Sequence, residues 1–200
     1  MNLFDAIQQR RAVKTFDAAC KIPEQDVKKI LSMARLSPTA YNQQNYRFVI
    51  IQDPGIREKI KTAAHGQAQV SDASLLIVLC ADTKAWEKNT EQYWSNTTAD
   101  LQKAKLQAMQ QYYLNREQAQ RDEAMRSCAL AAQNMMLTAK AMHYDSCPMI
   151  GFDFDAVAKL IQLPADHVIS MMLAIGKASQ AALPRFPQLA DEQLIFFDSF

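Results

Sequence analysis

The chain has 200 residues, 49% of them hydrophobic and 22% charged, and its formal net charge is +1. A chain of this length and composition builds one folded domain with a substantial core, which excludes an intrinsically disordered protein. The nearly balanced charge gives no electrostatic reason to expect a nucleic acid or an anionic membrane as a partner. The first residues lack the pattern of a secretory signal, and the longest uncharged apolar run, residues 75–81, is too short to cross a bilayer.

Apolar spacing predicts the elements of the first half of the chain. Helices are expected after three residues suited to a helix start: Asn2, Pro23 and Asp53. The β-branched and aromatic run at 46–52 predicts a strand, and the almost continuously apolar run at 74–81 predicts a strand covered on both faces. A polar loop at 39–44 precedes the first of these strands.

The second half begins with a long segment, Thr83 to Met142, that contains neither proline nor glycine and therefore predicts two or three helices. Within it, 126–142 is rich in small apolar residues and indicates a central, closely packed helix. Residues 101–120 are more polar and are expected to form either a solvated helical hairpin or a mobile cover.

The remaining elements follow a loop expected at 145–153. A helix at 154–161, capped by Asp153, and a strand at 168–175 are predicted next. Residues 178–192 show no periodicity and are predicted to form an extended arm. Its apolar end, Leu194-Ile195-Phe196-Phe197, is expected to be a strand that joins a sheet of its own chain or of a partner subunit.

Cysteine and glycine usage narrows the possible sites. The four cysteines are widely spaced and form no C-x-x-C pair, so we expect buried free thiols in a reducing cytoplasm rather than disulfides or a zinc site. Three scattered histidines share no metal-ligand spacing, and no metal is expected. The four glycines cannot form G-x-G-x-x-G or G-x-x-x-x-G-K-[ST], so a phosphate group must be held by side chains.

A basic turn, Arg10-Arg11-Ala12-Val13-Lys14, places three cations in five residues directly after the first helix. Guanidinium groups suit phosphate oxygens, although a solvated basic turn is the simpler interpretation of these residues alone. Three further motifs change that interpretation, and they are Ser37-Pro38-Thr39-Ala40-Tyr41-Asn42-Gln43-Gln44, Pro148-Met149-Ile150-Gly151-Phe152-Asp153 and Leu183-Pro184-Arg185-Phe186-Pro187.

These four motifs, in this order, resemble the nitroreductase family of flavin mononucleotide (FMN) enzymes over essentially the whole chain. The resemblance implies an α+β fold in which a mixed central sheet is flanked by helices. It implies a single domain over 1–200, with 178–200 as a C-terminal arm. It also implies an intertwined homodimer with C-terminal strand exchange and a non-covalently bound flavin at the interface.

The resemblance also implies roles for individual residues. Arg10, Arg11 and Arg185 are the candidates for the flavin phosphate, and Lys14 would tune the flavin ring. The complete set expected to bind the cofactor is Arg10, Arg11, Ala12, Lys14, Pro38, Thr39, Ala40, Asn42, Gln67, Gln69, Pro148, Met149, Ile150, Gly151 and Arg185. Tyr41, Tyr112 and Tyr113 are expected in the substrate pocket, although the last two are equally explained by ordinary helix packing.

The expected activity is that of an FMN-dependent NAD(P)H oxidoreductase. Hydride would pass from NADH or NADPH to flavin N5 and on to a small aromatic acceptor, a quinone or a nitroaromatic compound, in a ping-pong cycle. No side chain is needed as a general acid or base, because N5 carries the chemistry. The chain departs from the family pattern at three places: Ala12, where the family has serine, Asn45-Tyr46, and Ile150. A non-catalytic flavin-binding or flavin-sequestering dimer is the alternative, and a helical interaction module is a third hypothesis.

Overall fold

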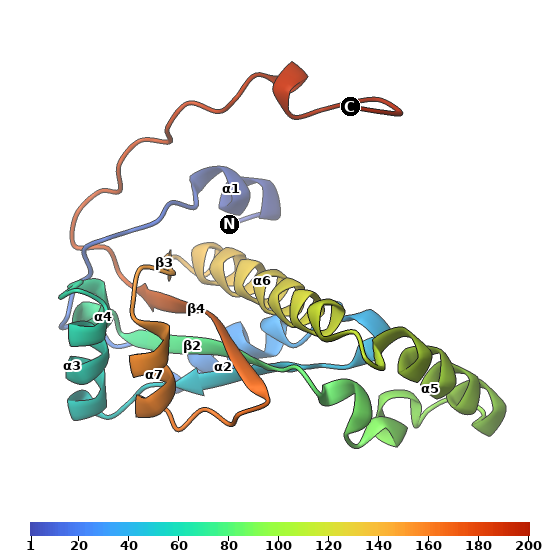
Figure 1. Ribbon diagram of the computed structural model, residues 1–200. Helices are drawn as coiled ribbons and strands as arrows, with labels where there is room; N and C mark the ends of the chain where they lie inside the picture. The colour runs from blue at the N-terminus through green and yellow to red at the C-terminus, as the bar shows by residue number, and fades with distance from the viewer.

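Four strands form one sheet in the order β1-β2-β4-β3, and every neighbouring pair is antiparallel (Figure 1). The computed structural model describes all residues, 1–200. The strands are β1 (Tyr46–Ile50), β2 (Leu75–Asp82), β3 (Asp145–Met149) and β4 (His167–Gly176). All eight residues of β2 are buried, as the continuous apolar run predicts.

Seven α-helices surround this sheet. They are α1 (Leu3–Gln9), α2 (Glu24–Ala34), α3 (Pro54–Ala63), α4 (Gln69–Asp72), α5 (Ala99–Tyr113), α6 (Glu117–Ala141) and α7 (Phe154–Leu160). Short 3-10 turns follow β2 and precede β1, at Ala85–Glu87 (η2), Thr90–Trp94 (η3) and Ala40–Asn42 (η1). The α+β class with a sheet flanked by helices is therefore confirmed, as are the helical content of 83–142 and the central helix expected at 126–142, which is part of α6. The mixed strand directions are not seen in this chain, because all three strand pairs are antiparallel.

Five of the helices pack in two layers on opposite faces of the sheet. On one face α2 and α6 contribute Ile30, Ala131 and Met135 to a buried cluster with Ile77 and Leu173. A second cluster of equal size joins α3, α4 and α7 to the same sheet through residues such as Ile60, Val70 and Val157. No helix of the chain combines the length and the apolar character that crossing a membrane would require.

The predicted helix starts have direct physical causes in the structure. The side chain of Asn2 accepts a hydrogen bond from the backbone N–H of Asp5 (2.9 Å) and caps α1. Asp53 caps α3 by accepting from Ile56 N (2.7 Å), with Pro54 in the first turn. Asp153 caps α7 in the same way.

The expectation of a loop at 145–153 is wrong for its first five residues, which form β3. The segment lacks the alternation of a typical strand, and Pro148 argues against an interior strand. Because β3 lies at the edge of the sheet, Pro148 can pair with Leu173 of β4 without disrupting a central ladder.

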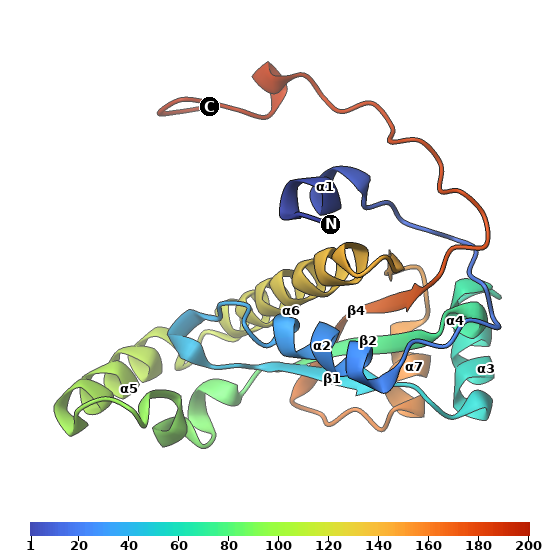
Figure 2. The same cartoon turned by 180° about the vertical axis from the view of Figure 1, so that it is seen from behind.

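The expectation of a strand at 194–197 is not met within a single chain. After β4 the chain extends away from the sheet as an arm whose only regular element is η4 (Asp191–Gln193) (Figures 1 and 2). Its apolar side chains are exposed from Leu183 to Phe200. A lone segment has no neighbour to satisfy its backbone N–H and C=O groups, so it does not form a strand by itself.

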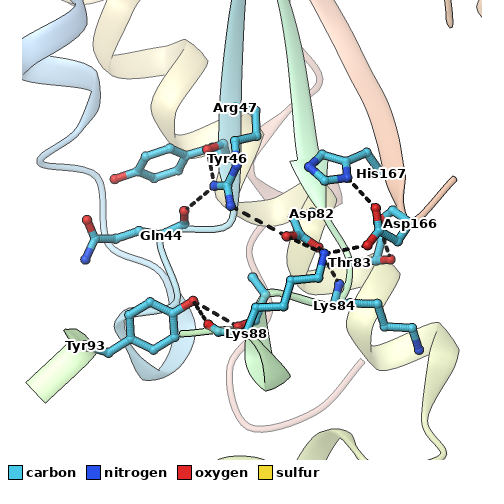
Figure 3. Close-up of polar contacts among 11 residues, drawn as sticks. Gln44, Tyr46, Arg47, Asp82, Thr83, Lys84, Lys88, Tyr93, Asp166 and His167 are labelled. Atoms are coloured by element: carbon cyan, nitrogen blue, oxygen red, sulfur yellow. Dashed lines mark hydrogen bonds and ion pairs between the residues drawn. The ribbon is translucent and has the colours of Figure 1, made fainter. Parts of the chain in front are cut away.

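A polar cluster fixes the segment after β2 to the end of the sheet (Figure 3). The ammonium of Lys88 lies between two carboxylates, 2.9 Å from Asp82 Oδ2 and paired with Asp166. Hydrogen bonds from Lys88 and then from His167 lower the pKa of Asp166 to about 2. Asp82, Asp166 and His167 present three metal-ligand atoms close together, but Lys88 already occupies the position of a cation, and the cluster is an ion-pair network.

Candidate functional site

The basic turn lies along the edge strand β3. Ala12 forms an isolated parallel bridge with Ser146, and Val13 N donates to Ser146 O (3.0 Å). Val13 is buried in the core and anchors the turn. The cations of the turn, Arg10, Arg11 and Lys14, are thereby held beside the sheet rather than on a free loop.

The turn and the arm line one cavity of ≈ 550 Å³. Arg10, Arg11, Ala12 and Lys14 line one side of it, and residues 180–188 of the arm, including Arg185, line the other. Arg185 Nη2 donates to the backbone carbonyls of Ile7, Gln8 and Arg10 at 3.2–3.3 Å. Four cations separated by up to 175 residues in sequence therefore face one space.

This cavity carries uncompensated positive charge. None of its four cations forms an ion pair with a carboxylate. The pKa of Arg10 is lowered, first by partial burial and then by the neighbouring charges of Arg185 and Arg11. Binding of an anion relieves the repulsion between like charges held together in this way. Guanidinium groups also donate strong hydrogen bonds to phosphate oxygens.

A second set of predicted residues lies close to the turn, at the end of β3. Lys14 Nζ is 3.4 Å from Cys147 Sγ, just before the segment Pro148–Gly151. Gln67 Nε2 donates to Gly151 O (2.7 Å), and Gln69 Nε2 donates to Gln67 Oε1 (2.9 Å).

Ile150 and Gly151 are both exposed there. A Cβ on Gly151 would meet its nearest atom at 3.7 Å, an ordinary contact. The packing of the chain does not require a glycine at this position, and the missing side chain leaves the backbone open to close approach by another molecule.

The other predicted residues form a separate group around η1. Positive φ angles occur at Tyr41 (55°) and Asn42 (53°) in this turn and at Gln44 (45°), two residues after it. Asparagine tolerates this left-handed conformation, but tyrosine and glutamine rarely adopt it. The turn is held by hydrogen bonds, including Asn42 Nδ2 to Tyr93 O (2.8 Å) and Gln44 N to Thr39 Oγ1 (3.0 Å).

Three tyrosines are among the residues that line a cavity of ≈ 650 Å³ next to this turn. The ring of Tyr41 lies 6.2 Å from that of Tyr112 and 5.9 Å from that of Tyr113, measured between centroids. Tyr113 is buried against Trp86, whereas Tyr112 is partly exposed and lies under the guanidinium of Arg116. Tyr113 therefore packs as part of the protein interior, and Tyr41 and Tyr112 offer exposed ring surface.

Within one chain these two groups lie at opposite ends of the molecule. The basic turn, α4 and the end of β3 are at one end, and η1 with the start of α6 is at the other (Figures 1 and 2). The structure brings Arg10, Arg11, Ala12, Lys14 and Arg185 together, and separately brings Ala40 and the three tyrosines together. A site that uses both groups requires two chains.

Sequence reasoning missed several residues of these cavities. Thr15 and Gln180 line the cation cavity, and their positions beside the basic turn and the arm motif were the available signal. Glu123 and Arg126 line the tyrosine cavity. Nothing in the local sequence distinguishes Glu123 from the solvated acids around it, because its burial depends on how α6 meets η1.

The nitroreductase family model matches residues 7–177 of the chain. Protein DrgA of Synechocystis sp. (strain ATCC 27184 / PCC 6803 / Kazusa) is 47% identical over 182 residues, which cover 91% of this chain and 87% of that protein. MhqN of Bacillus subtilis (strain 168), whose name includes the words NAD(P)H nitroreductase, is 33% identical with 86% of each chain covered.

Among solved structures, one from Exiguobacterium sibiricum 255-15 in complex with FMN has a TM-score of 0.90 at 26% identity, with 99% of this chain and 98% of that chain covered. A nitroreductase-like protein from Streptococcus mutans has a TM-score of 0.88 at 26% identity, with 98% of each chain covered. The family match spans the basic turn, η1 and β3, and together with the curated relatives it establishes that the chain belongs to the nitroreductase family.

Proposed function

We propose that the protein is a homodimeric, FMN-dependent NAD(P)H oxidoreductase that reduces small aromatic acceptors, quinones or nitroaromatic compounds. The observation that carries this proposal is the cavity in which Arg10, Arg11, Lys14 and Arg185 meet without a carboxylate partner. This donor set fits the phosphate of FMN, which the basic turn and the arm would hold between them. The FMN-bound relative supports the choice of anion.

The residues beyond the phosphate would hold the rest of the cofactor. Lys14 would place its charge beside the flavin ring, where a cation stabilises developing negative charge. Gln67 and Gln69 would offer amide groups to the ring edge, and the segment 148–151, in which Ile150 and Gly151 are exposed, would approach its face. When bound, the flavin would supply the redox chemistry by accepting hydride from NADH or NADPH at N5 and passing it to the acceptor.

The partner subunit would supply the η1 side of the site, with Pro38, Thr39, Ala40 and Asn42 closing over the cofactor. Tyr41 and Tyr112 would then present ring faces to the substrate pocket. Aromatic rings stack favourably on such faces, which suits an aromatic acceptor. Tyr113 also lines this cavity, and it would support the two exposed rings because its own ring is almost fully buried.

The free edge of β1 is where we propose that the partner's arm docks. The opposite sheet edge, β3, is covered by the basic turn, whereas β1 has no neighbour on its outer side. A hollow of ≈ 610 Å³ beside β1 is lined by Tyr46, Phe48 and Leu31, together with the cations Lys28, Arg35 and Arg47.

The arm end carries matching chemistry. Asp191 and Glu192 precede the apolar run 194–197, so acids and apolar side chains would meet cations and apolar surface at the β1 edge. Strand addition would also satisfy the open backbone groups of both segments.

An absorption spectrum of the purified protein, followed by anaerobic titration with NADH and NADPH, tests the proposed function. We expect a flavin spectrum near one FMN per chain, bleaching by at least one of the nicotinamides, and recovery when a quinone is added. A flavin that neither nicotinamide bleaches would favour the non-catalytic flavin-binding dimer. A colourless protein that takes up no added FMN would refute both.

The four cysteines of the protein, all unpaired, fit the reducing cytoplasm that we propose as the location of the protein.

A further inference from the structure

A buried carboxylate on α6 holds the strained turn that carries Tyr41. Glu123 is only 4% exposed, and its Oε1 accepts a hydrogen bond from the backbone N–H of Ala40 at 2.9 Å. The same oxygen accepts from Ser127 Oγ at 2.9 Å, and Oε2 pairs with the more exposed Arg126. Both oxygens of the carboxylate therefore have partners, which is what keeps a buried charge in place.

The turn needs such a tether because its backbone is in an unfavourable conformation. Tyr41 and Asn42 both have positive φ, and the bond from Glu123 reaches the residue immediately before them. Strained residues persist where their surroundings over-determine them, and they are concentrated at functional sites. Without the acceptor on α6, the first N–H of η1 would lose its partner and the turn would be free to relax.

The position of the Tyr41 ring depends on this turn. Its ring contacts Tyr112 and Tyr113 at the cavity that Ala40 and Glu123 also line. On the other side, Asn42 Nδ2 donates to the carbonyl of Tyr93, whose hydroxyl donates to Ala85 O (2.9 Å). The turn is thus fixed at both ends, to α6 through Glu123 and to η3 through Asn42.

We propose that Glu123 is a positioning residue for the acceptor pocket. It acts through the N–H of Ala40 and does not itself touch the substrate. It sets the orientation in which Tyr41 meets the acceptor, so it determines acceptor affinity rather than the rate of hydride transfer. This inference rests on the proposed function for its kinetic consequence, but the tether itself is independent of any cofactor.

The test compares Glu123→Gln, which keeps an oxygen acceptor for Ala40, with Glu123→Met, which has a similar length and no oxygen acceptor. We expect Glu123→Met to raise KM for a quinone at least tenfold with kcat changed less than threefold, and Glu123→Gln to stay within about threefold of wild type in both. Glu58→Ala, which removes an exposed carboxylate on α3, is the control and should leave both constants unchanged.

Amide hydrogen exchange of residues 39–44 in flavin-free protein gives a readout that needs no activity. Exchange should be slow in wild type and Glu123→Gln and faster in Glu123→Met. If Glu123→Met is too unstable to purify, Ser127→Ala, which removes one partner of the same oxygen, should show a smaller change in the same direction.

The outcomes separate the two proposals. Unchanged KM in an active Glu123→Met enzyme would overturn the positioning role while leaving the proposed function intact. A fall in kcat as large as the rise in KM, in both Glu123→Met and Glu123→Gln, would show that the carboxylate is merely structural. That result would also overturn the positioning role. A wild-type protein without flavin or reductase activity would refute the proposed function, and the exchange experiment would still decide whether the tether exists.

Discussion

Replacing Arg185 with alanine should weaken FMN binding and leave riboflavin binding almost unchanged. Arg185 lies across the cation cavity from the basic turn, and its own hydrogen bonds, at 3.2–3.3 Å to exposed carbonyls, contribute little to stability. A hydrogen bond between charged partners contributes about 1.5–3 kcal/mol. The loss of one corresponds to a roughly 10- to 150-fold increase in the Kd for FMN. Riboflavin has no phosphate, so its affinity should change by less than about twofold.

Quenching of flavin fluorescence during titration of flavin-free protein measures both affinities. Arg121→Ala, which removes an exposed arginine that forms no ion pair, is the matched control and should affect neither ligand. The melting temperature of flavin-free Arg185→Ala should stay constant or rise slightly, because one of several repelling cations is gone. An equal loss of riboflavin and FMN affinity would refute the phosphate assignment, as would an unchanged preference for FMN.

Three further predictions follow from the same structure. Arg10→Ala combined with Lys14→Ala should lower flavin occupancy and slow flavin reduction in stopped-flow measurements, while gel filtration still shows the wild-type oligomer. Deleting the residues after Leu189 should weaken the dimer because the arm end is lost, and an undiminished dimer in sedimentation would contradict this. Lys88→Met should lower the free energy of unfolding by about 1–3 kcal/mol in urea titrations. Because the pKa of Asp166 is lowered from 3.8 to about 2, its contribution is present above pH 3.8 and is lost as the pH falls toward 2. Lys88→Met should make this decline smaller, and the hydrogen bond from His167 should retain part of it.

The core of the fold could be predicted because local rules act there without competition. The helix starts at Asn2, Asp53 and Asp153 are each determined by one side chain and a nearby N–H. The strand at β2 follows from an unbroken apolar run that only two covered faces can accommodate. Predicting these elements required no knowledge of the rest of the chain.

Elements that depend on distant partners could not be predicted in the same way. β3 contains Pro148 and forms because β4 offers an edge to pair with, which no local pattern reveals. The end of the arm has the composition of a strand but no neighbour in its own chain. Glu123 is chemically like the exposed acids of α6, and its burial follows from the contact between α6 and η1.

The grouping of the motif residues could not be predicted from local rules, because residues that are far apart in sequence lie close together in space. Arg185 reaches the basic turn only through the path of the arm after β4. The resemblance of the four motifs to a family supplied that grouping in advance, whereas the residues alone left a solvated basic turn as the simpler interpretation. The geometry of the cation cavity is what favours the anion site.

The separation of the cation cavity from η1 has a genetic consequence. If each active centre takes its cations from one subunit and its tyrosines from the other, a defect in either region damages both centres of a mutant homodimer. When chains altered at Arg185 are co-expressed with chains altered at Tyr41, however, each mixed dimer contains one doubly damaged centre and one that is wholly intact. Two defective alleles should therefore complement each other in the same cell.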